Sequence, residues 1–577
     1  RAATDVAYNR VTMKVLSFLL LVALAVAKPQ NQTNDAPEKA QLDEDFGYVT
    51  VRTGSHMFYV VYHVDQPGDW TTYPLIMWLQ GGPGSSGVGY GNLAELGPYD
   101  VNGNKRDGAW TKKANVMFVD NPVGTGYSYV DNFDYLCEDE QCIANDLVEL
   151  VKGAMEAVPD LQKMPFYAFS ESYGGKMVTD FALAFDAAIK NGDVVSDFQG
   201  IGIGDAWVSP MDSVNTWGEY LYNMGFVNEE GRGAIDAAAA TTQGYVDNGQ
   251  WGLATNAWSY TEGVVMQKTD GVNFYNVLTE EDVYRKNGLK PHSRDLSYMR
   301  PEVRELYKRH VHRYPRNVMD VIYDLMNGEY ADRWNIPANV EWDGQGGYVF
   351  DTLSKDFMKP VIDSVSQILD TTDIHVAVYN GNLDLICDSI GTWNWVKKLT
   401  WGDMNSWYGA TQKSLYISDY SSVAAYYQRA NQFSVFSILR SGHMVPEDAP
   451  STSLAMIDLV TQWGAEAKEA AKAKKNMTSP ITVTKEEPKQ AEAVAAPKKV
   501  QHEEAVTTEA EEAVVVKSSP VRKSPVAPIV TVKKVKKALN TTRAKVARVG
   551  HLNPATPTGK RFAHMATNAR KPKHVKK

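Results

Sequence analysis

Short, continuously apolar runs recur along this chain, and helical patterns at residues 144–157 and 177–189 lie between several of them. Each run ends in a loop rich in Gly, Asn or Asp. A strand that is apolar at every position is buried on both faces, which is typical of a parallel sheet covered by helices on either side. The alternation therefore predicts an α/β fold with a mostly parallel central sheet. The apolar runs are residues 74–79, 116–119, 166–169, 201–203, 374–379 and 433–439.

Two stretches depart from this alternation. Residues 48–51 and 57–62 are β-branched and aromatic runs joined by Arg-Thr-Gly-Ser, which is the pattern of a β-hairpin. Between about residues 205 and 347 helical segments replace the strands, which predicts an inserted helical cap over the C-terminal edge of the sheet. An amphipathic helix at 451–463 then closes the domain, so we expect the folded domain to cover residues 41–464.

Charge is divided between this domain and the segment that follows it. The whole chain has a formal net charge of −10, but residues 465–577 contain 25 Lys and Arg against 10 Glu, a net charge of +15. This composition, with almost no aromatic residues, predicts a disordered basic tail, because too little apolar surface is available to offset the entropy of ordering. A solvated extension is the simpler interpretation, and binding of polyanions such as glycosaminoglycan or nucleic acid is the alternative. The acidic folded domain is not expected to bind nucleic acid.

The N-terminal region has the layout of a secretory signal peptide. Met13 is followed by a Lys, an apolar run and the small-residue end Ala25-Val26-Ala27, so residues 13–27 are expected to be removed. Residues 1–12 precede this methionine and are interpreted as non-native upstream residues. The apolar run is too short to span a bilayer comfortably, and no transmembrane segment is expected. The protein is therefore expected to enter the secretory pathway and to be secreted or lysosomal.

The cysteines fit an oxidising compartment. A disulfide bond between Cys137 and Cys142 would close a short loop and leave Cys387 free, and three unpaired thiols are the alternative. Three Asn-x-Ser/Thr sequences are candidate glycosylation sites, although such sequences also arise by chance. They begin at Asn31, Asn476 and Asn540.

The strongest local signal is the sequence Phe-Tyr-Ala-Phe-Ser-Glu-Ser-Tyr-Gly-Gly at residues 166–175. An apolar strand runs into a sharp turn and then into a helix that begins near Lys176. A serine at such a turn is lifted out of the sheet, and its neighbours must be small. Ser170 replaces the first Gly of the usual G-x-S-x-G pattern. The placement between strand and helix indicates that Ser172 is a nucleophile.

A nucleophilic serine needs a base, and the base needs a carboxylate that orients it. On a sheet of this kind the chain order is Ser, Asp, His, with the Asp and the His on loops after later strands. His443 follows the run at 433–439, and Asp384 follows the run at 374–379. Each alone could be an ordinary loop residue, but order and placement together favour a triad of Ser172, Asp384 and His443. Asp388 is the alternative acid.

A second signal is the sequence Trp-Leu-Gln-Gly-Gly-Pro-Gly-Ser-Ser-Gly at residues 78–87, directly after a strand. Consecutive glycines let backbone N–H groups point into a site, which suits an oxyanion hole completed by the N–H of Tyr173. A phosphate-binding loop is excluded because no Gly-Lys-Ser/Thr follows. The Gly-Ile-Gly-Ile-Gly sequence at 200–204 lacks dinucleotide-binding spacing and is interpreted as a strand end. The spacing of His and Cys is not typical of metal ligands, and no metal or cofactor is expected.

These motifs, in this order, resemble those of the serine carboxypeptidase family, the peptidase branch of the α/β-hydrolase fold. The resemblance covers roughly residues 46–463 and does not extend into the tail. Several segments are most similar to the retinoid-inducible type of this family. The resemblance rests on residues 78–84, 120–128, 170–177, 205–214 and 270–276, together with Asp384 and the Gly-His-Met sequence at 442–444.

The resemblance implies a serine-type carboxypeptidase that hydrolyses the C-terminal bond of peptides or proteins through an acyl-enzyme, as a monomer or homodimer. It assigns the triad to Ser172, Asp384 and His443. Most members have Asn where this chain has Gln80, a difference that bears on terminal-residue preference. The remaining implied roles are the oxyanion donors Gly82 and Tyr173, the residues at the substrate's terminal carboxylate, Gln80, Gly81, Glu171 and Glu95, and the leaving-residue pocket, Cys387 and Met444.

Glu171 is an unusual neighbour for a nucleophile, because an ionised carboxylate would repel a developing oxyanion. Its presence makes sense if the carboxyl group is protonated and donates a hydrogen bond to a substrate carboxylate. Glu171 and Glu95 would then share a proton in a desolvated site, which favours activity at acidic pH. His443 must be uncharged to act as a base, whereas Asp384 stabilises its charged form, so these two requirements compete.

Two other functions are open at this point. An acyltransferase on the same scaffold would use the same triad, but it would need a pocket that excludes water. A non-catalytic scaffold protein is less consistent with an intact triad and elbow, and covalent labelling of Ser172 would distinguish it.

Overall fold

The computed structural model describes residues 42–279 and 316–478. The predicted signal peptide, the candidate glycosylation sites Asn31 and Asn540, and the tail beyond residue 478 lie outside the described residues. Part of the predicted cap also lies outside them.

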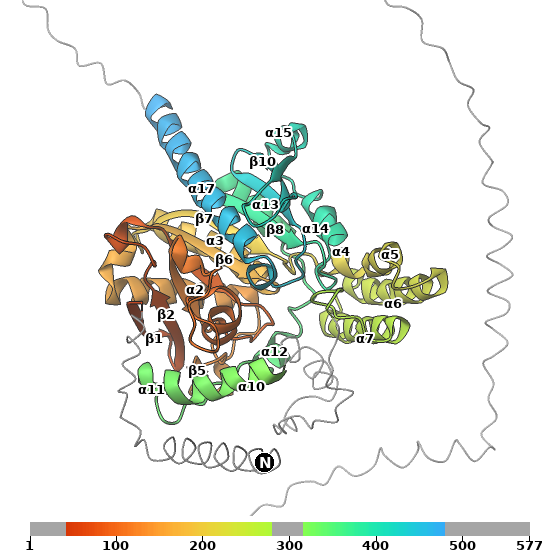
Figure 1. Ribbon diagram of the computed structural model, residues 1–577, viewed down its shortest axis with the longest axis horizontal. Coiled ribbons are helices and arrows are strands. Elements are labelled where there is room, and N and C mark those ends of the chain that lie inside the picture. Colours follow the sequence, from red (N-terminus) through yellow and green to blue (C-terminus); the bar gives the residue numbers. More distant parts are fainter. Residues whose placement is uncertain (1–41, 280–315, 479–577) are drawn as a thin grey trace, which may run out of the picture. The chain divides into compact units, whose positions relative to one another are not determined.

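An eleven-stranded mixed sheet organises the described residues (Figure 1). Its central strands run parallel to one another, and the strands at both edges pair antiparallel. The prediction of a mostly parallel sheet in an α/β-hydrolase fold is therefore confirmed. In order across the sheet the strands are β1 (Glu44–Arg52), β2 (Ser55–Tyr62), β4 (Asn115–Val119), β3 (Leu75–Leu79), β6 (Pro165–Glu171), β7 (Asp197–Gly204), β8 (His375–Gly381), β11 (Phe433–Ile438), β10 (Ala425–Ala430) and β9 (Lys413–Leu415), and β5 (Tyr129–Val130) pairs with β2.

Helices cover both faces of the sheet, and two adjacent side chains of β6 show how. Phe166 packs against Phe185 of α3, with ring centroids 5.6 Å apart. Tyr167 points to the opposite face, as the next residue of a strand must. There its hydroxyl donates a hydrogen bond of 2.7 Å to the Thr461 carbonyl of α17. The helices outside the cap are α2 (Glu140–Ala157), α3 (Gly174–Asn191), α13 (Ile362–Thr371), α14 (Ser389–Val396), α15 (Met404–Gly409), α16 (Val445–Asp448) and α17 (Pro450–Thr478), with short helical turns η1 (Trp70–Thr72), η2 (Gly87–Leu96), η3 (Trp110–Lys112), η4 (Phe133–Tyr135) and η5 (Pro159–Lys163).

The segment between β7 and β8 is helical, as the sequence predicts. The predicted helix at 233–240 lies inside α6, and the one at 317–326 coincides closely with α10. Helices α6 and α7 pack against each other and lie beside the sheet in Figure 1. The described helices of this segment are α4 (Pro210–Val214), α5 (Trp217–Asn223), α6 (Glu229–Asp247), α7 (Trp251–Thr269), α10 (Arg316–Leu325), η6 (Met326–Tyr330), α11 (Ala331–Arg333) and α12 (Gly347–Leu353).

The last helix is longer than the sequence indicated. We expected disorder from residue 465, but α17 continues to Thr478, so that expectation is wrong for residues 465–478. The extra turns are rich in Ala, Lys and Glu, which are strong helix formers. Side chains add local support, because Glu466 pairs with Arg429 at 3.0 Å and Glu469 pairs with Lys472 at 2.8 Å. The candidate glycosylation site Asn476 lies in this extension.

The glycines at 200–204 have a role that the sequence did not reveal. They lie within β7 and do not mark only its end. A Cβ atom on Gly202 would lie 2.1 Å from the ring of Phe169 on the neighbouring strand β6. Glycine is needed there because large aromatic side chains of the adjacent strands lie across the β7 backbone.

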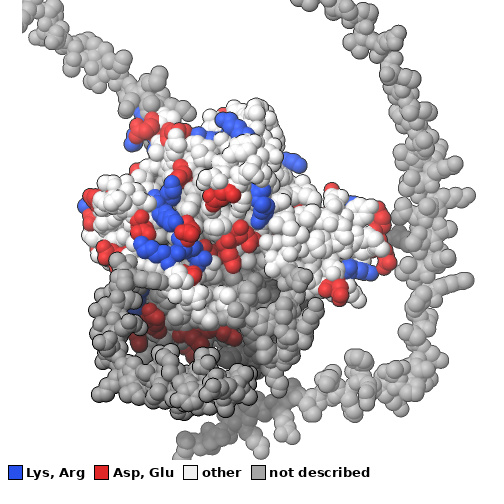
Figure 2. Space-filling view, in the orientation of Figure 1, with Lys and Arg blue, Asp and Glu red and all other residues white. Residues whose placement is uncertain are grey.

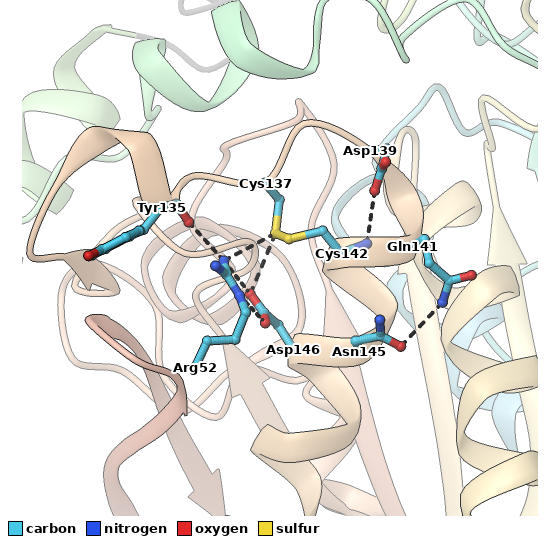
Figure 3. The surroundings of a disulfide bond; sticks show 8 residues. All are labelled: Arg52, Tyr135, Cys137, Asp139, Gln141, Cys142, Asn145 and Asp146. Carbon is cyan, nitrogen blue, oxygen red and sulfur yellow. Dashed lines mark hydrogen bonds and ion pairs between the residues drawn. A yellow bond between two sulfur atoms is a disulfide. The ribbon is translucent and has the colours of Figure 1, made fainter.

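A disulfide bond joins Cys137, which lies just before α2, to Cys142 in the first turn of α2 (Figure 3). The N-cap residue Asp139 lies inside this loop and accepts a hydrogen bond of 3.0 Å from the Cys142 N–H. Arg52 of β1 forms an ion pair of 2.6 Å with the buried Asp146 of α2. Arg52 also lies 3.5 Å from the Cys137 sulfur, so the loop is held against both β1 and α2.

Among residues 42–279 and 316–478, no helix is long and apolar enough to cross a membrane. Figure 2 shows Lys and Arg interspersed with Asp and Glu on one face of the described residues.

Candidate active site

Ser172 lies in the turn between β6 and α3. Its backbone has φ of 62°, in the left-handed region that non-glycine residues seldom adopt. Backbone hydrogen bonds to the end of β7 and the turn after it hold Ser172 in place. The Ser172 N–H donates to the Gly204 carbonyl at 3.0 Å, and the Ser172 carbonyl accepts from the Trp207 N–H at 2.9 Å. Ser172 is partly exposed between buried neighbours, Glu171 and Tyr173. Such a strained, rigid turn presents a serine hydroxyl above the edge of the sheet.

Asp384 and His443 form a buried hydrogen-bonded pair. Both side chains are fully buried, and His443 Nδ1 lies 2.8 Å from Asp384 Oδ2. The other oxygen of Asp384 accepts a hydrogen bond of 3.3 Å from the Cys387 N–H. His443 Nε2 is buried and has no hydrogen-bond partner among the described residues. Because Nδ1 faces Asp384, Nε2 is the nitrogen left to interact with a nucleophile.

The three residues follow parallel strands of one sheet. Ser172 comes directly after β6, Asp384 follows β8, and His443 follows β11. The carboxyl ends of parallel strands meet at the same edge of a sheet, which is where ligands bind in open α/β folds.

Asp388, the alternative acid, is engaged elsewhere. It is the N-cap of α14 and accepts hydrogen bonds of 2.9 Å from Ile390 N and 3.0 Å from Gly391 N. The Thr216 hydroxyl donates to its other oxygen at 2.7 Å. Burial raises the pKa of Asp388 to about 7. The structure therefore places Asp384, and not Asp388, against His443.

The glycine loop after β3 lies directly against the nucleophile turn. A Cβ atom on Gly81 would lie 2.5 Å from Ser172 Cβ and 3.0 Å from Tyr173 N, so only glycine fits there. Gly82, the next residue, has φ of 114° and is partly exposed. Its backbone and that of Tyr173 are the two predicted sources of oxyanion donors, and the loop places them on adjoining segments.

The side chain of Tyr173 is held by a buried ion pair that no sequence pattern indicated. Lys176 pairs with Asp356 at 2.6 Å, and the Tyr173 hydroxyl donates to the same carboxylate at 3.0 Å. Burial opposes ionisation of Asp356, but the Lys176 ammonium holds the pKa of Asp356 below its usual range. Glu140 of α2 lies beside the Tyr173 hydroxyl, and burial raises the pKa of Glu140 to about 8. Glu140 and Asp356 are far in sequence from Tyr173 and Lys176, and only the fold brings them together.

Gln80, Glu95 and Glu171 form a second buried cluster next to the nucleophile. The Gln80 amide donates from Nε2 to Glu95 Oε1 at 2.8 Å and to Glu171 Oε1 at 3.0 Å. Its oxygen accepts a hydrogen bond of 2.7 Å from the Trp78 indole. Glu95 comes from η2, which is buried along its whole length. The structure thus brings together three of the four residues predicted at a substrate carboxylate, and the fourth, Gly81, follows Gln80 directly.

Cys387 lies close to the His443–Asp384 pair and within electrostatic range of Glu171. It is a free thiol and fully buried. Burial raises the pKa of Cys387 well above its usual range, and the charges of Asp384 and Glu171 act in the same direction. Met444, predicted in the same pocket, is buried next to His443.

Residues 274–277 of the cap segment are bonded to the loops that carry Asp384 and His443. The His443 N–H donates to the Tyr275 carbonyl at 2.6 Å, and the Tyr275 ring lies edge-on to the imidazole at 5.2 Å. The Leu385 N–H donates to the Phe274 carbonyl at 3.0 Å, and the Val277 N–H donates to the carbonyl of Leu383 at 3.0 Å. This segment is therefore part of the site and not a separate covering.

A mostly parallel sheet, a serine at a strained strand-to-helix turn and an Asp–His pair on later loops define an α/β-hydrolase. The chain belongs to the serine carboxypeptidase family, because the family model of that description matches residues 34–463. It is accordingly a hydrolase, a serine-type carboxypeptidase, and the family membership predicted from its motifs is confirmed.

Known relatives agree with this assignment. The retinoid-inducible serine carboxypeptidase of Mus musculus is 38% identical over 456 residues, which cover 78% of this chain and 97% of the relative. Serine carboxypeptidase-like 51 of Arabidopsis thaliana is 32% identical over 461 residues, and the matched region covers 77% of this chain and 98% of the relative. The crystal structure of the prohormone-processing carboxypeptidase Kex1 of Saccharomyces cerevisiae has a TM-score of 0.61 at 19% identity, with 73% of this chain and 91% of that chain covered, and supports the fold.

Proposed function

We propose that Ser172, His443 and Asp384 hydrolyse the C-terminal peptide bond of a substrate in two steps. The Ser172 hydroxyl attacks the carbonyl carbon while His443 Nε2 takes its proton, and Asp384 stabilises the resulting imidazolium. Collapse of the tetrahedral intermediate breaks the C–N bond, and His443 returns the proton to the departing amino acid. Water then hydrolyses the acyl-enzyme by the same route. The observation that carries the proposal is the buried imidazole, which is hydrogen-bonded to Asp384 through Nδ1 and whose Nε2 has no hydrogen-bond partner in the part of the chain that the structure describes.

The oxyanion of each tetrahedral intermediate would be bound by the N–H groups of Gly82 and Tyr173. Two features support this role. The glycine loop lies directly against the nucleophile turn. A Cβ atom added at Gly81 would come within 2.5 Å of Ser172 Cβ. The Tyr173 side chain is fixed by Asp356 and Lys176, so its backbone is held in place before the reaction. Preorganised donors of this kind contribute most when they need not move.

The free carboxylate of the substrate would be recognised by Gln80, Gly81, Glu171 and Glu95. The Gln80 amide directs both of its hydrogens at the two glutamates, so it holds them side by side in a buried place. Two buried carboxyl groups this close cannot both ionise at little cost, which supports a shared proton. A protonated Glu171 could donate to the substrate carboxylate, and this binding mode would be favoured at acidic pH.

Peptides that differ only in a free or an amidated C-terminus test this assignment. At pH 5 we expect the free acid to be cleaved with a kcat/KM at least about tenfold higher than the amide, because one charged hydrogen bond at the terminal carboxylate corresponds to about that factor. Equal rates for both peptides, with no trend of KM with pH, would indicate a general esterase or acyltransferase. Adding a nucleophilic alcohol and looking for an ester product separates acyl transfer from hydrolysis.

We also propose that the protein acts in the secretory pathway, in a secreted or lysosomal setting. The signal-peptide layout of residues 13–27 supports entry into that pathway, and the Cys137–Cys142 disulfide fits an oxidising compartment. The basic tail could bind polyanions there, because its last seventeen Lys and Arg, all after Glu512, are not accompanied by any acidic residue. Retention on heparin that weakens with salt, and that a truncated chain lacks, is the expected result.

A further inference from the structure

A second buried acid, Asp205, lies beside the proposed catalytic acid. Asp205 follows β7 directly, in a turn where its backbone has φ of 40°. The Asp205 N–H donates to the Tyr379 carbonyl of β8 at 2.8 Å. This is the same turn whose residues Gly204 and Trp207 hold the backbone of Ser172. One turn therefore contacts both the nucleophile and the strand that carries the acid.

The two oxygens of Asp205 have different surroundings. Oδ1 accepts a hydrogen bond of 2.7 Å from Gly381 N and one of 3.0 Å from Asn380 Nδ2. Oδ2 is buried and receives no hydrogen bond from an N–H or hydroxyl donor of the described residues. The carboxyl group lies in hydrogen-bonding contact with the carboxyl group of Asp384. Both side chains are fully buried.

An ionised Asp205 would be costly in this place. Its Oδ2 would be a desolvated charge without a donor, next to a second buried carboxylate. Among the residues that the structure describes, no Lys or Arg forms an ion pair with it. Burial, together with the charges of Asp384 and Asp448, raises the pKa of Asp205 well above its usual range.

We propose that Asp205 is a positioning residue of the triad, a protonated carboxyl group whose Oδ2–H donates a hydrogen bond to Asp384. The inference rests on the triad proposed above. Asp384 would then accept three hydrogen bonds, from the His443 imidazole, the Cys387 N–H and the Asp205 hydroxyl. A third donor disperses the negative charge of Asp384 and weakens its attraction for an imidazolium. His443 would stay uncharged, and able to act as a base, in more acidic solution than an Asp–His pair alone allows.

The other ionisable groups around the pair support this assignment. Asp448 of α16 and Asp388 at the start of α14 both approach Asp384 and disfavour further negative charge. The Cys387 thiol and the Tyr379 phenol lie near Asp205, and burial raises the pKa of each well above its usual range, so both are neutral. His443 is therefore the group in this surrounding set that can become positively charged. A neutral Asp205 stabilises the His443 imidazolium less than an ionised Asp205 would.

Two substitutions separate a protonated Asp205 from an ionised one. In Asp205→Asn the amide Nδ2 can donate to Asp384 and the oxygen can accept from Gly381 N, so it reproduces the protonated acid. We expect the acid limb of its kcat/KM profile to keep the wild-type midpoint. In Asp205→Ala the donor is lost, and the midpoint should move to higher pH by about half a unit to one unit, with a three- to tenfold loss at pH 4.5 and a smaller loss at pH 7.

Two kinetic results would overturn the inference. If Asp205 is ionised in the wild type, Asp205→Asn removes a negative charge and its acid limb moves to lower pH. If Asp205 is only structural, Asp205→Ala loses the same factor at every pH.

Infrared spectroscopy tests the protonation state of Asp205 directly. It does not require turnover, and it does not depend on the Asp205→Ala variant being folded. The wild-type minus Asp205→Asn difference spectrum at pH 7 should contain the carbonyl stretch of a protonated carboxyl group, and its absence would contradict the inference. Labelling of wild-type protein by a fluorophosphonate probe tests the triad separately. A protonated Asp205 in a protein that is not labelled would mean that the proposed function, and not the acid pair, is wrong.

Discussion

Asp384 and Glu171 are both buried carboxyl groups at the same edge of the sheet, and each has a second acid beside it, but their main partners differ. Asp384 faces an imidazole at 2.8 Å, which can gain a positive charge during a reaction. Glu171 faces the Gln80 amide at 3.0 Å, which stays neutral. The difference suits the first pair to moving protons and the second to binding an anion. The comparison predicts that chemistry and substrate recognition can be impaired separately.

The largest effect is expected from Ser172→Ala. Removing the attacking hydroxyl should lower kcat by about 10⁶-fold, the scale measured for the corresponding serine of subtilisin. Binding of a free-acid peptide should change little, because the Gln80–Glu95–Glu171 cluster is untouched. Fluorophosphonate labelling and the dissociation constant of a non-cleaved peptide measure the two effects. If the variant is still labelled, or if it no longer binds the peptide, then chemistry and substrate recognition are not separate functions of the two carboxyl pairs.

Next in size is Asp384→Asn. It should lower kcat by about 10⁴-fold by turning the imidazole to the wrong tautomer, as in the trypsin precedent. Asp388→Asn is the matched control, because it changes a buried aspartate four residues away that caps α14. The control should lose less than about tenfold in kcat and about 1 kcal/mol of stability. If the control has the larger kinetic effect, the acid has been assigned to the wrong residue.

Glu171→Gln tests only the recognition of the substrate's terminal carboxylate. In the wild type, KM for a free-acid peptide should rise on the order of tenfold between pH 5 and pH 7.5, because loss of a shared proton places two anions against each other. The glutamine keeps a donor and cannot ionise, so its KM should be nearly independent of pH. The amidated peptide is the control substrate and should become relatively better near neutrality. A pH trend that persists in Glu171→Gln would place its origin elsewhere.

A smaller change is expected from Gln80→Asn. The shorter side chain cannot reach both Glu95 Oε1 and Glu171 Oε1, so one hydrogen bond is lost and kcat/KM for free-acid peptides should fall about two- to tenfold. Ser172 labelling should proceed at the wild-type rate. Equal losses for free and amidated peptides would show that Gln80 supports the fold and not recognition.

The smallest effect is on stability and concerns Glu140, which belongs to neither pair. Burial raises its pKa from about 4.5 to about 8, so the folded protein binds a proton that the unfolded chain releases. That contribution is fully present below pH 4.5 and is lost as the pH rises through 8. The wild-type Tm should therefore fall by a few degrees between pH 5 and pH 8, and by less in Glu140→Gln. Identical pH trends in both proteins would contradict the assignment.

The fold and the main residues of the proposed site could both be inferred from the sequence, because both follow from local patterns. Apolar runs mark the central strands, and the chain order of Ser172, Asp384 and His443 follows from the loops after those strands. The side chains that contact and position these residues could not be predicted in the same way. Lys176 and Asp356 are 180 residues apart, and no pattern around either indicates the other. Asp205 reads as a turn residue in the sequence, and its contact with Asp384 arises only from the pairing of β7 with β8.

The backbone bonds between residues 274–277 and the loops of Asp384 and His443 bear on how this enzyme could be re-engineered. Phe274 and Tyr275 supply carbonyls to the loops of Asp384 and His443, so this segment cannot be exchanged without disturbing the imidazole. Helices α6 and α7 make no such bond to those loops among the described residues. A chimera that takes its α6–α7 hairpin from a relative, with joints placed between α5 and α6 and before residue 272, would keep the bonds that Asp205, Trp207 and Tyr220 make. It could therefore inherit a new substrate preference while the loops of Asp384 and His443 stay unaltered.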